Sequence, residues 1–142
     1  MNQHGRGTTG NSNRHIGLYE LLQTLGSGGS SKVYLGKHMF LDTEAAVKVL
    51  RASIVHEQTE QFEMEARIIA SLRHPHIVRI LDFDVENNIP FLVMEFAPYG
   101  SLRQRHPAGL PVPLVTVVSY VKQIAGALQY AHDREVIHRD IK

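Results

Sequence analysis

A run of glycines lies between two segments that have the composition of β-strands, and this placement restricts the fold. The run is Gly26-Ser27-Gly28-Gly29, and residues 18–22 and 32–36 on either side are rich in leucine, valine and tyrosine. Glycine has no Cβ, so the backbone of such a run can approach a phosphate closely. A dinucleotide-binding fold needs a helix directly after its glycines. The strand that follows here disfavours a nicotinamide-binding protein, and a plain flexible hairpin turn is the other interpretation.

The spacing of apolar residues divides most of the remaining chain into strands and helices. The expected elements, in chain order, are a strand at 45–50, a helix at 56–72, strands at 77–83 and 89–96 joined by a turn at 86–88, a long helix from Pro113 to about Asp133, and a strand-like entry into a loop at 136–142. Residues 1–16 are rich in glycine, asparagine, threonine and serine. Such a segment buries too little apolar surface to offset its ordering entropy, so we expect a disordered leader there.

Composition limits the classes of function that remain. The chain has 142 residues, 43% of them hydrophobic, which is enough for one globular domain. A formal net charge of +1 indicates neither a nucleic-acid partner nor a membrane partner. The chain contains no cysteine, which excludes disulfides and thiolate metal sites and fits a cytoplasmic location. It shows no signal peptide and no apolar run long enough to cross a bilayer, so we expect no membrane contact within this segment; an anchor beyond Lys142 stays open.

A lysine lies inside one of the apolar strands. Because alternate residues of a strand share a face, Lys48 points the same way as Ala46 and Leu50, while Val47 and Val49 point the other way. An unpaired buried charge is costly, so this ammonium needs a partner or a ligand. The alternative is an edge strand whose lysine simply reaches solvent.

A glutamate raises the same question on the helix at 56–72. Glu65 lies three residues after Phe62 and four before Ile69, which places it on the stripe expected to face the core. Lys48 is its natural partner. The alternative is that Glu65 lies at the margin of the stripe and reaches solvent.

The last motif is His138-Arg139-Asp140. The carboxylate of Asp140 is suited to accept a proton from an attacking hydroxyl, and Lys142 is suited to neutralise charge on a phosphoryl group. A plain polar loop is the alternative for this motif taken alone.

Taken together, these features resemble a eukaryotic-type (Hanks-type) Ser/Thr protein kinase domain of the bacterial kind. Lys48 follows Gly26 by 22 residues and Glu65 follows Lys48 by 17, in the order of that family. The stretches that carry the resemblance, over about residues 17–142, are 25–33, 46–48, 72–78, 93–96 and 138–142. The implied fold is α+β: a small lobe (17–96) made of a twisted antiparallel five-stranded sheet with one helix, then a hinge and the start of a helical large lobe (97–142).

The resemblance implies an enzyme that transfers a phosphoryl group from ATP to protein hydroxyls. ATP and a protein substrate are the implied partners, with no nucleic acid. The glycine run would cover the ATP phosphates, Lys48 would bind the α- and β-phosphates, and Glu65 would hold Lys48 in place. Asp140 would orient and deprotonate the substrate hydroxyl, and Lys142 favours Ser/Thr as the acceptor. The implied adenine contacts are Leu25, Val33, Ala46, Met94 and the backbones of Glu95 and Ala97.

Two departures from the family pattern affect these expectations. Ser31 stands where the family often has its third glycine, and its side chain is small enough for the loop to tolerate. The family's metal-binding Asn would fall five residues after Asp140, beyond Lys142, as would its Asp-Phe-Gly segment, so the Mg²⁺ ligands lie outside these residues and no metal site is expected within them. We therefore expect no useful phosphoryl transfer by the 142-residue chain alone. A truncated, non-catalytic fragment that binds nucleotide or regulates a partner is the alternative function.

Overall fold

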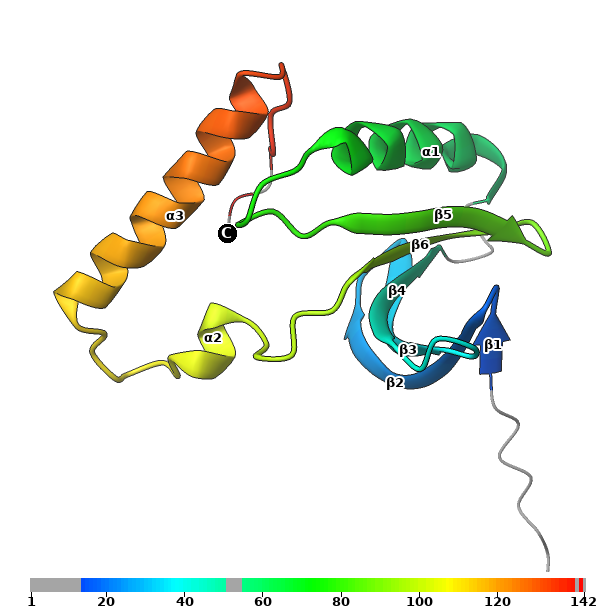
Figure 1. Cartoon of the computed structure of the whole chain (residues 1–142), viewed down its shortest axis with the longest axis horizontal. Coiled ribbons are helices and arrows are strands. Elements are labelled where there is room, and N and C mark those ends of the chain that lie inside the picture. The colour runs from blue at the N-terminus through cyan, green and yellow to red at the C-terminus, as the bar shows by residue number, and fades with distance from the viewer. Residues whose placement is uncertain (1–13, 51–54, 140, 142) are drawn as a thin grey trace, which may run out of the picture.

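The computed structural model describes residues 14–50, 55–139 and 141. These residues form nine elements, in chain order β1 (Arg14–Ile16), β2 (Tyr19–Ser27), β3 (Ser31–His38), β4 (Glu44–Leu50), α1 (Val55–Ser71), β5 (Ile80–Glu86), β6 (Ile89–Glu95), α2 (Leu102–Arg105) and α3 (Leu114–His132). The strands make one curled antiparallel sheet in the order β1-β2-β3-β4-β6-β5. Figure 1 shows α1 lying along β5 and β6, and α3 standing apart from the sheet, joined to it through α2.

The two faces of the sheet bury two separate clusters of apolar side chains, because successive residues of a strand point to opposite faces. One cluster, which we call the first core, consists of the buried residues Ile16, Ala45, Val47, Phe91 and Val93. The second core joins the sheet to α1 and contains Leu50, Phe62, Ala66 and Leu92. Lys48 therefore belongs to the face that carries α1, as the alternation in its strand predicts.

The turn between β5 and β6 fixes the pairing of those two strands. Asn87 and Asn88 both have positive φ angles, 51° and 61°. Two such residues make the type I′ turn, whose twist matches that of a hairpin, and asparagine tolerates this conformation better than most residues. The turn expected at 86–88 is therefore confirmed, with Glu86 paired to Ile89 across it.

The turn between β1 and β2 contacts the far end of the sheet. Gly17 has a φ of +52°, and a Cβ at this position would lie 2.7 Å from Cζ of Phe91. The Gly17 N–H donates a hydrogen bond to Oε2 of Glu86, at 3.2 Å. Glycine is thus required both by the backbone conformation and by the close approach to the first core.

The structure differs from the sequence expectations in three places. The sheet has six strands rather than five, because residues 14–16, expected in the disordered leader, pair with β2 and bury Ile16; residues 1–13 lie outside the described part. Residues 136–139 form no strand, and Ile137 is exposed. The short helix α2 was not expected.

The apolar side of α3 is largely exposed in this chain. Leu114 and Val115 are each 77% exposed, and Val121 is 58% exposed. Exposed apolar surface of this extent drives association in water. We expect the 142-residue polypeptide to self-associate, which light scattering at several concentrations will measure. A monomer at every concentration, with a sharp cooperative melt, would contradict this expectation.

Candidate functional site

The glycine run forms the loop between β2 and β3. Its backbone is closed by a hydrogen bond from the Gly28 N–H to the carbonyl of Ser31, at 2.9 Å. A Cβ at Gly26 or Gly29 would have no neighbour within 4 Å, and one at Gly28 would only touch the Ser31 carbonyl at 3.8 Å. None of these three glycines has the positive φ that requires glycine. Neither packing nor backbone conformation within the described chain therefore explains why glycine stands at these three positions.

The register of the sheet gathers most of the predicted nucleotide contacts on one face. Val33 pairs with Gly26 on one side and with Lys48 on the other. One step along β4, Ala46 pairs with Met94 of β6. Directly paired residues share a face, and so do alternate residues of a strand. The face that carries α1 therefore presents Gly26, Val33, Ala46, Lys48 and Met94. Ser27 and the partly exposed Leu25 lie at the end of β2 beside this face.

The ammonium of Lys48 lies on this face beside the second core. Its Nζ is 5.7 Å from the centroid of the Phe62 ring, within the range of a weak cation–π contact. The side chain is half-buried, so part of it keeps access to solvent. Lys48 is therefore placed to meet an anionic group that enters this face.

The sequence predicts that Glu65 faces the core, and the structure shows that this prediction is wrong. Its side chain is exposed, whereas Phe62 and Ala66 of the same helix are buried. Because each residue turns a helix by about 100°, Glu65 lies at the margin of the buried stripe, as the alternative for this residue stated. The salt bridges between described residues do not include one from Lys48 to Glu65, and the functional pairing of the two stays a prediction.

The segment after β6 leaves the sheet at the level of Met94, which packs against the second core. The Glu95 N–H donates to the carbonyl of Arg79 at 2.9 Å, and its carboxylate lies 3.6 Å from the Arg79 guanidinium. The carbonyl of Ala97 accepts from the Gly100 N–H at 3.2 Å. The Ala97 N–H has no hydrogen-bond partner among the described residues, so it can bind the edge of a base.

The motif at the end of the chain is described only in part. His138 and Arg139 are exposed, and Arg139 has a φ of +61°, a conformation uncommon for residues other than glycine. The two residues to which catalytic roles were assigned here, Asp140 and Lys142, lie outside the described residues. Their roles stay predictions.

Contacts that the sequence did not reveal join α3 to the segment after α1. The Arg73 N–H donates to the hydroxyl of Tyr130 at 3.1 Å. The Tyr130 ring contacts His74, at 5.2 Å between ring centroids, and the Arg134 guanidinium, which lies 3.6 Å from the Tyr130 centroid. The rings of His74 and His76 contact each other, and the His76 N–H donates to Nδ1 of His74. Within the described residues, no group of three or more potential ligands is placed to hold a metal ion.

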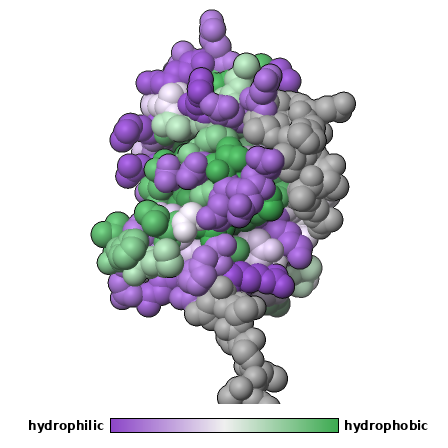
Figure 2. Space-filling view, turned by 90° about the vertical axis from the view of Figure 1, so that its right-hand side faces the viewer, coloured by the Kyte–Doolittle hydropathy of each residue, from purple (hydrophilic) through white to green (hydrophobic). Residues whose placement is uncertain are grey.

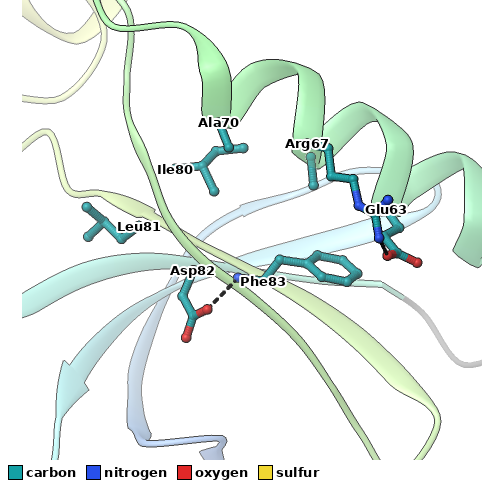
Figure 3. A pocket seen from close by; sticks show the side chains of 8 residues that line it. Glu63, Arg67, Ala70, Ile80, Leu81, Asp82 and Phe83 are labelled. Atoms are coloured by element: carbon teal, nitrogen blue, oxygen red, sulfur yellow. Dashed lines mark hydrogen bonds and ion pairs between the residues drawn. The ribbon is translucent and has the colours of Figure 1, made fainter.

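A groove separate from the predicted nucleotide site lies on the side of α1 that faces β5. Figure 3 shows it between α1 and β5, with Asp82 turned towards the Phe83 N–H and Arg67 paired with Glu63 at its rim. Its volume is about 320 Å³. None of the predicted nucleotide contacts lines it; the lining residues are Glu63, Ala66, Arg67, Ala70, Ile80, Leu81, Asp82 and Phe83.

The turn between β3 and β4 contains an ion pair between Lys37 and Asp42. The Lys37 ammonium lies 2.6 Å from the Asp42 carboxylate in the turn between β3 and β4. The hydrogen bond that the Lys37 ammonium donates to the Asp42 carboxylate, followed by the negative charge of that carboxylate, raises the pKa of Lys37. This ammonium already has an acidic partner within the chain, and we assign it no ligand.

Known proteins resemble this chain in sequence and in structure. The family described as "Protein kinase domain" matches residues 19–142. The serine/threonine-protein kinase PrkC of Bacillus subtilis is 35% identical over 131 residues, which cover 91% of this chain and 20% of PrkC. PknF of Mycobacterium tuberculosis is 39% identical over 130 residues, which cover 87% of this chain and 27% of PknF. The chain thus spans about a quarter or less of these relatives.

A solved structure shows the same architecture. The crystal structure of the M. tuberculosis PknI kinase domain superposes with a TM-score of 0.76 at 28% identity, over 92% of this chain and 55% of that one. The sheet, the single helix packed on it and the first helices beyond the hinge are therefore those of a kinase small lobe and the beginning of a large lobe. The helices of the described part include none long and apolar enough to span a membrane.

Proposed function

Because the chain belongs to the protein kinase family, we propose that it binds ATP and contributes to phosphoryl transfer from ATP to Ser or Thr hydroxyls of a protein. The fold supplies the small lobe, which holds the nucleotide in this family of reactions. Asp140 is assigned to orient and deprotonate the acceptor hydroxyl, and Lys142 to neutralise charge on the transferred group. Mg²⁺ is the expected counter-ion of the phosphates. The absence of cysteine fits a reducing compartment, and we place this domain in the cytoplasm.

One observation carries the proposal. Nothing within the described chain requires glycine at Gly26, Gly28 or Gly29, and Val33 pairs both with Gly26 and with Lys48, so the glycine loop and the lysine share one face. Space without Cβ atoms lets backbone N–H groups approach phosphate oxygens. Lys48 provides a compact positive charge for the same group. The glycine loop and Lys48 therefore fit the phosphates of a nucleoside triphosphate.

The apolar part of this face fits an adenine ring. Val33 and Met94 are half-buried, and Ala46, which pairs with Met94, is buried, so these three side chains make this part of the face apolar. The neighbouring Ala97 N–H, which has no partner among the described residues, is placed to donate to a ring nitrogen. Together they supply stacking area and one directional contact, which is the usual composition of a small-molecule site.

Titration with a fluorescent ATP analogue will test the nucleotide site. We expect saturable binding to the 142-residue chain, displaced by ATP and not by NAD. Displacement by NAD with equal efficiency, or no saturable binding by a chain shown to be folded by circular dichroism, would overturn the assignment. Incubation with radiolabelled ATP and a protein acceptor will separate binding from transfer, since we expect no transfer by these residues alone.

A further inference from the structure

Acidic residues are missing from one continuous part of the chain. Residues 96–132 contain no aspartate or glutamate, but they contain Arg103, Arg105 and Lys122. Three cations and no anion give this segment a formal charge of +3, so the remaining residues carry −2 of the chain's net +1. The segment spans the hinge, α2 and α3, and is therefore a local positive region on a nearly neutral protein.

The acidic residues at either end of this segment are engaged elsewhere. Glu95 pairs with Arg79, and Asp133 accepts a hydrogen bond from the Gln129 amide at 2.7 Å. Both arginines of α2, Arg103 and Arg105, are exposed, and neither takes part in an ion pair among the described residues. Their guanidinium groups are free to bind an anion from outside the chain.

Although α2 has only four residues, its ends are fixed by side chains. Ser101 and Gln104 form a capping box: the Ser101 hydroxyl accepts from the Gln104 N–H, and the Gln104 side chain accepts from the Ser101 N–H at 2.7 Å. Beyond the other end, Nε2 of His106 lies 2.9 Å from the Tyr120 hydroxyl of α3. The two arginines therefore project from a backbone that is already ordered, which lowers the entropy cost of binding.

We propose that α2 binds a carboxylate-rich segment of the protein substrate through Arg103 and Arg105. This inference rests on the proposed kinase function, because it assigns a substrate class to the same site. Guanidinium groups bind carboxylates through paired, charge-assisted hydrogen bonds. Helix α2 begins seven residues after β6 ends, and Figure 1 shows it between the sheet and the start of α3. The two arginines therefore lie on the segment that leads directly away from the predicted nucleotide site.

A nucleic acid is a weaker candidate for the same arginines. The charge of −2 on the remainder of the chain repels a long polyanion, whereas a short acidic peptide meets only the local positive region. Tyr99, which is 81% exposed beside α2, adds apolar area for a peptide side chain. Charge complementarity at short range therefore favours a protein segment.

Fluorescence anisotropy of a labelled serine peptide will test the inference. One peptide carries four glutamates around the serine, and a matched peptide carries glutamines instead. We expect the 142-residue chain to prefer the glutamate peptide, and the double variant Arg103→Gln/Arg105→Gln to bind it about tenfold more weakly at low salt. The double variant Arg14→Gln/Arg73→Gln, which removes the same charge from exposed positions outside residues 96–132, is the matched control and should lose much less.

Three results would overturn the proposal: equal affinity for the two peptides, equal loss in the two double variants, or stronger displacement by a single-stranded oligonucleotide than by the unlabelled glutamate peptide. Titration of each variant with the fluorescent ATP analogue separates this inference from the nucleotide site. If the analogue binds and the peptide preference is absent, only the substrate class is wrong. If the peptide preference is present without nucleotide binding, the surface on α2 stands and the kinase function falls.

Discussion

Replacement of Phe91 by alanine is expected to lower the free energy of unfolding by about 3–5 kcal/mol, the largest loss for a single side chain in this fold. Phe91 is 2% exposed and lies in the first core, where the Gly17 backbone packs against its ring. Its removal leaves a cavity that the paired strands β4 and β5 cannot close. Because small domains are stable by only about 5–15 kcal/mol, much of that stability disappears. Urea unfolding followed by circular dichroism will measure the change.

The matched control is Phe40→Ala in the turn between β3 and β4. Phe40 is 77% exposed, so its loss should change the free energy of unfolding by less than about 0.5 kcal/mol. Equal effects of the two alanines would show that the first core does not contribute to stability as described. A second variant, Gly17→Ala, should also destabilise the domain, and less so when combined with Phe91→Leu, since the Cβ at residue 17 contacts the end of that ring.

Replacement of Lys48 by methionine is expected to weaken binding of the fluorescent ATP analogue by at least about tenfold. Methionine keeps the length and much of the apolar contact with Phe62, so the second core stays packed. Only the positive charge beneath the glycine loop is lost. A charge-assisted hydrogen bond to a phosphate contributes about 1.5–3 kcal/mol, which corresponds to this change in affinity. The same titration that detects nucleotide binding will measure it.

Lys122→Met is the control for this prediction. Lys122 is exposed on α3, which stands apart from the sheet (Figure 1), so its removal changes the net charge equally without touching the site. Affinity for the analogue should stay within about twofold of the original, by the small effect of an exposed distant charge. If both methionines weaken binding equally, Lys48 acts only through net charge and its assignment as the phosphate ligand is wrong.

The strongly periodic elements follow from the sequence. The helix expected at 56–72 is found at Val55–Ser71, and the one expected from Pro113 is found at Leu114–His132, with Pro113 at its N-cap. Proline at that position has no N–H to leave unbonded and a φ compatible with a helix start. Long apolar stripes and a proline stop or start are local signals, which is why they predict helices within a residue or two.

The sequence did not predict the elements that depend on partners far away along the chain. The strand at Arg14–Ile16 has one apolar residue, and it forms because β2 offers an edge and the first core buries Ile16. The apolar residues after Val136 have no neighbouring strand among the described residues, so their composition alone makes no strand. The strand expected at 77–83 begins at Ile80, because Ile77 closes a turn with the carbonyl of His74. A strand is a property of a pair, and one sequence segment does not specify it.

The sequence selects the residues proposed for the nucleotide site, and it says less about their geometry. The register places Gly26, Val33, Ala46, Lys48 and Met94 on one face, and their roles stay predictions. The exposure of Glu65 was not predictable, because a residue at the edge of a helical stripe is separated from the core by a small rotation. A local signal for α2 did exist: Ser101 followed three residues later by Gln104 is a capping box.

The strand order of the sheet also bears on how the domain assembles. Within the segment 14–50 and within the hairpin 80–95, paired strands are neighbours in the chain, and pairs such as Glu86 with Ile89 close very short loops. The ladder between β4 and β6 instead joins residues such as Val47 and Val93, 46 positions apart. Loop-closure entropy opposes that step most, so we expect the two units to form first and dock later. Lys48 and Met94 share a face only after this docking, so the nucleotide site is among the last features to appear during folding.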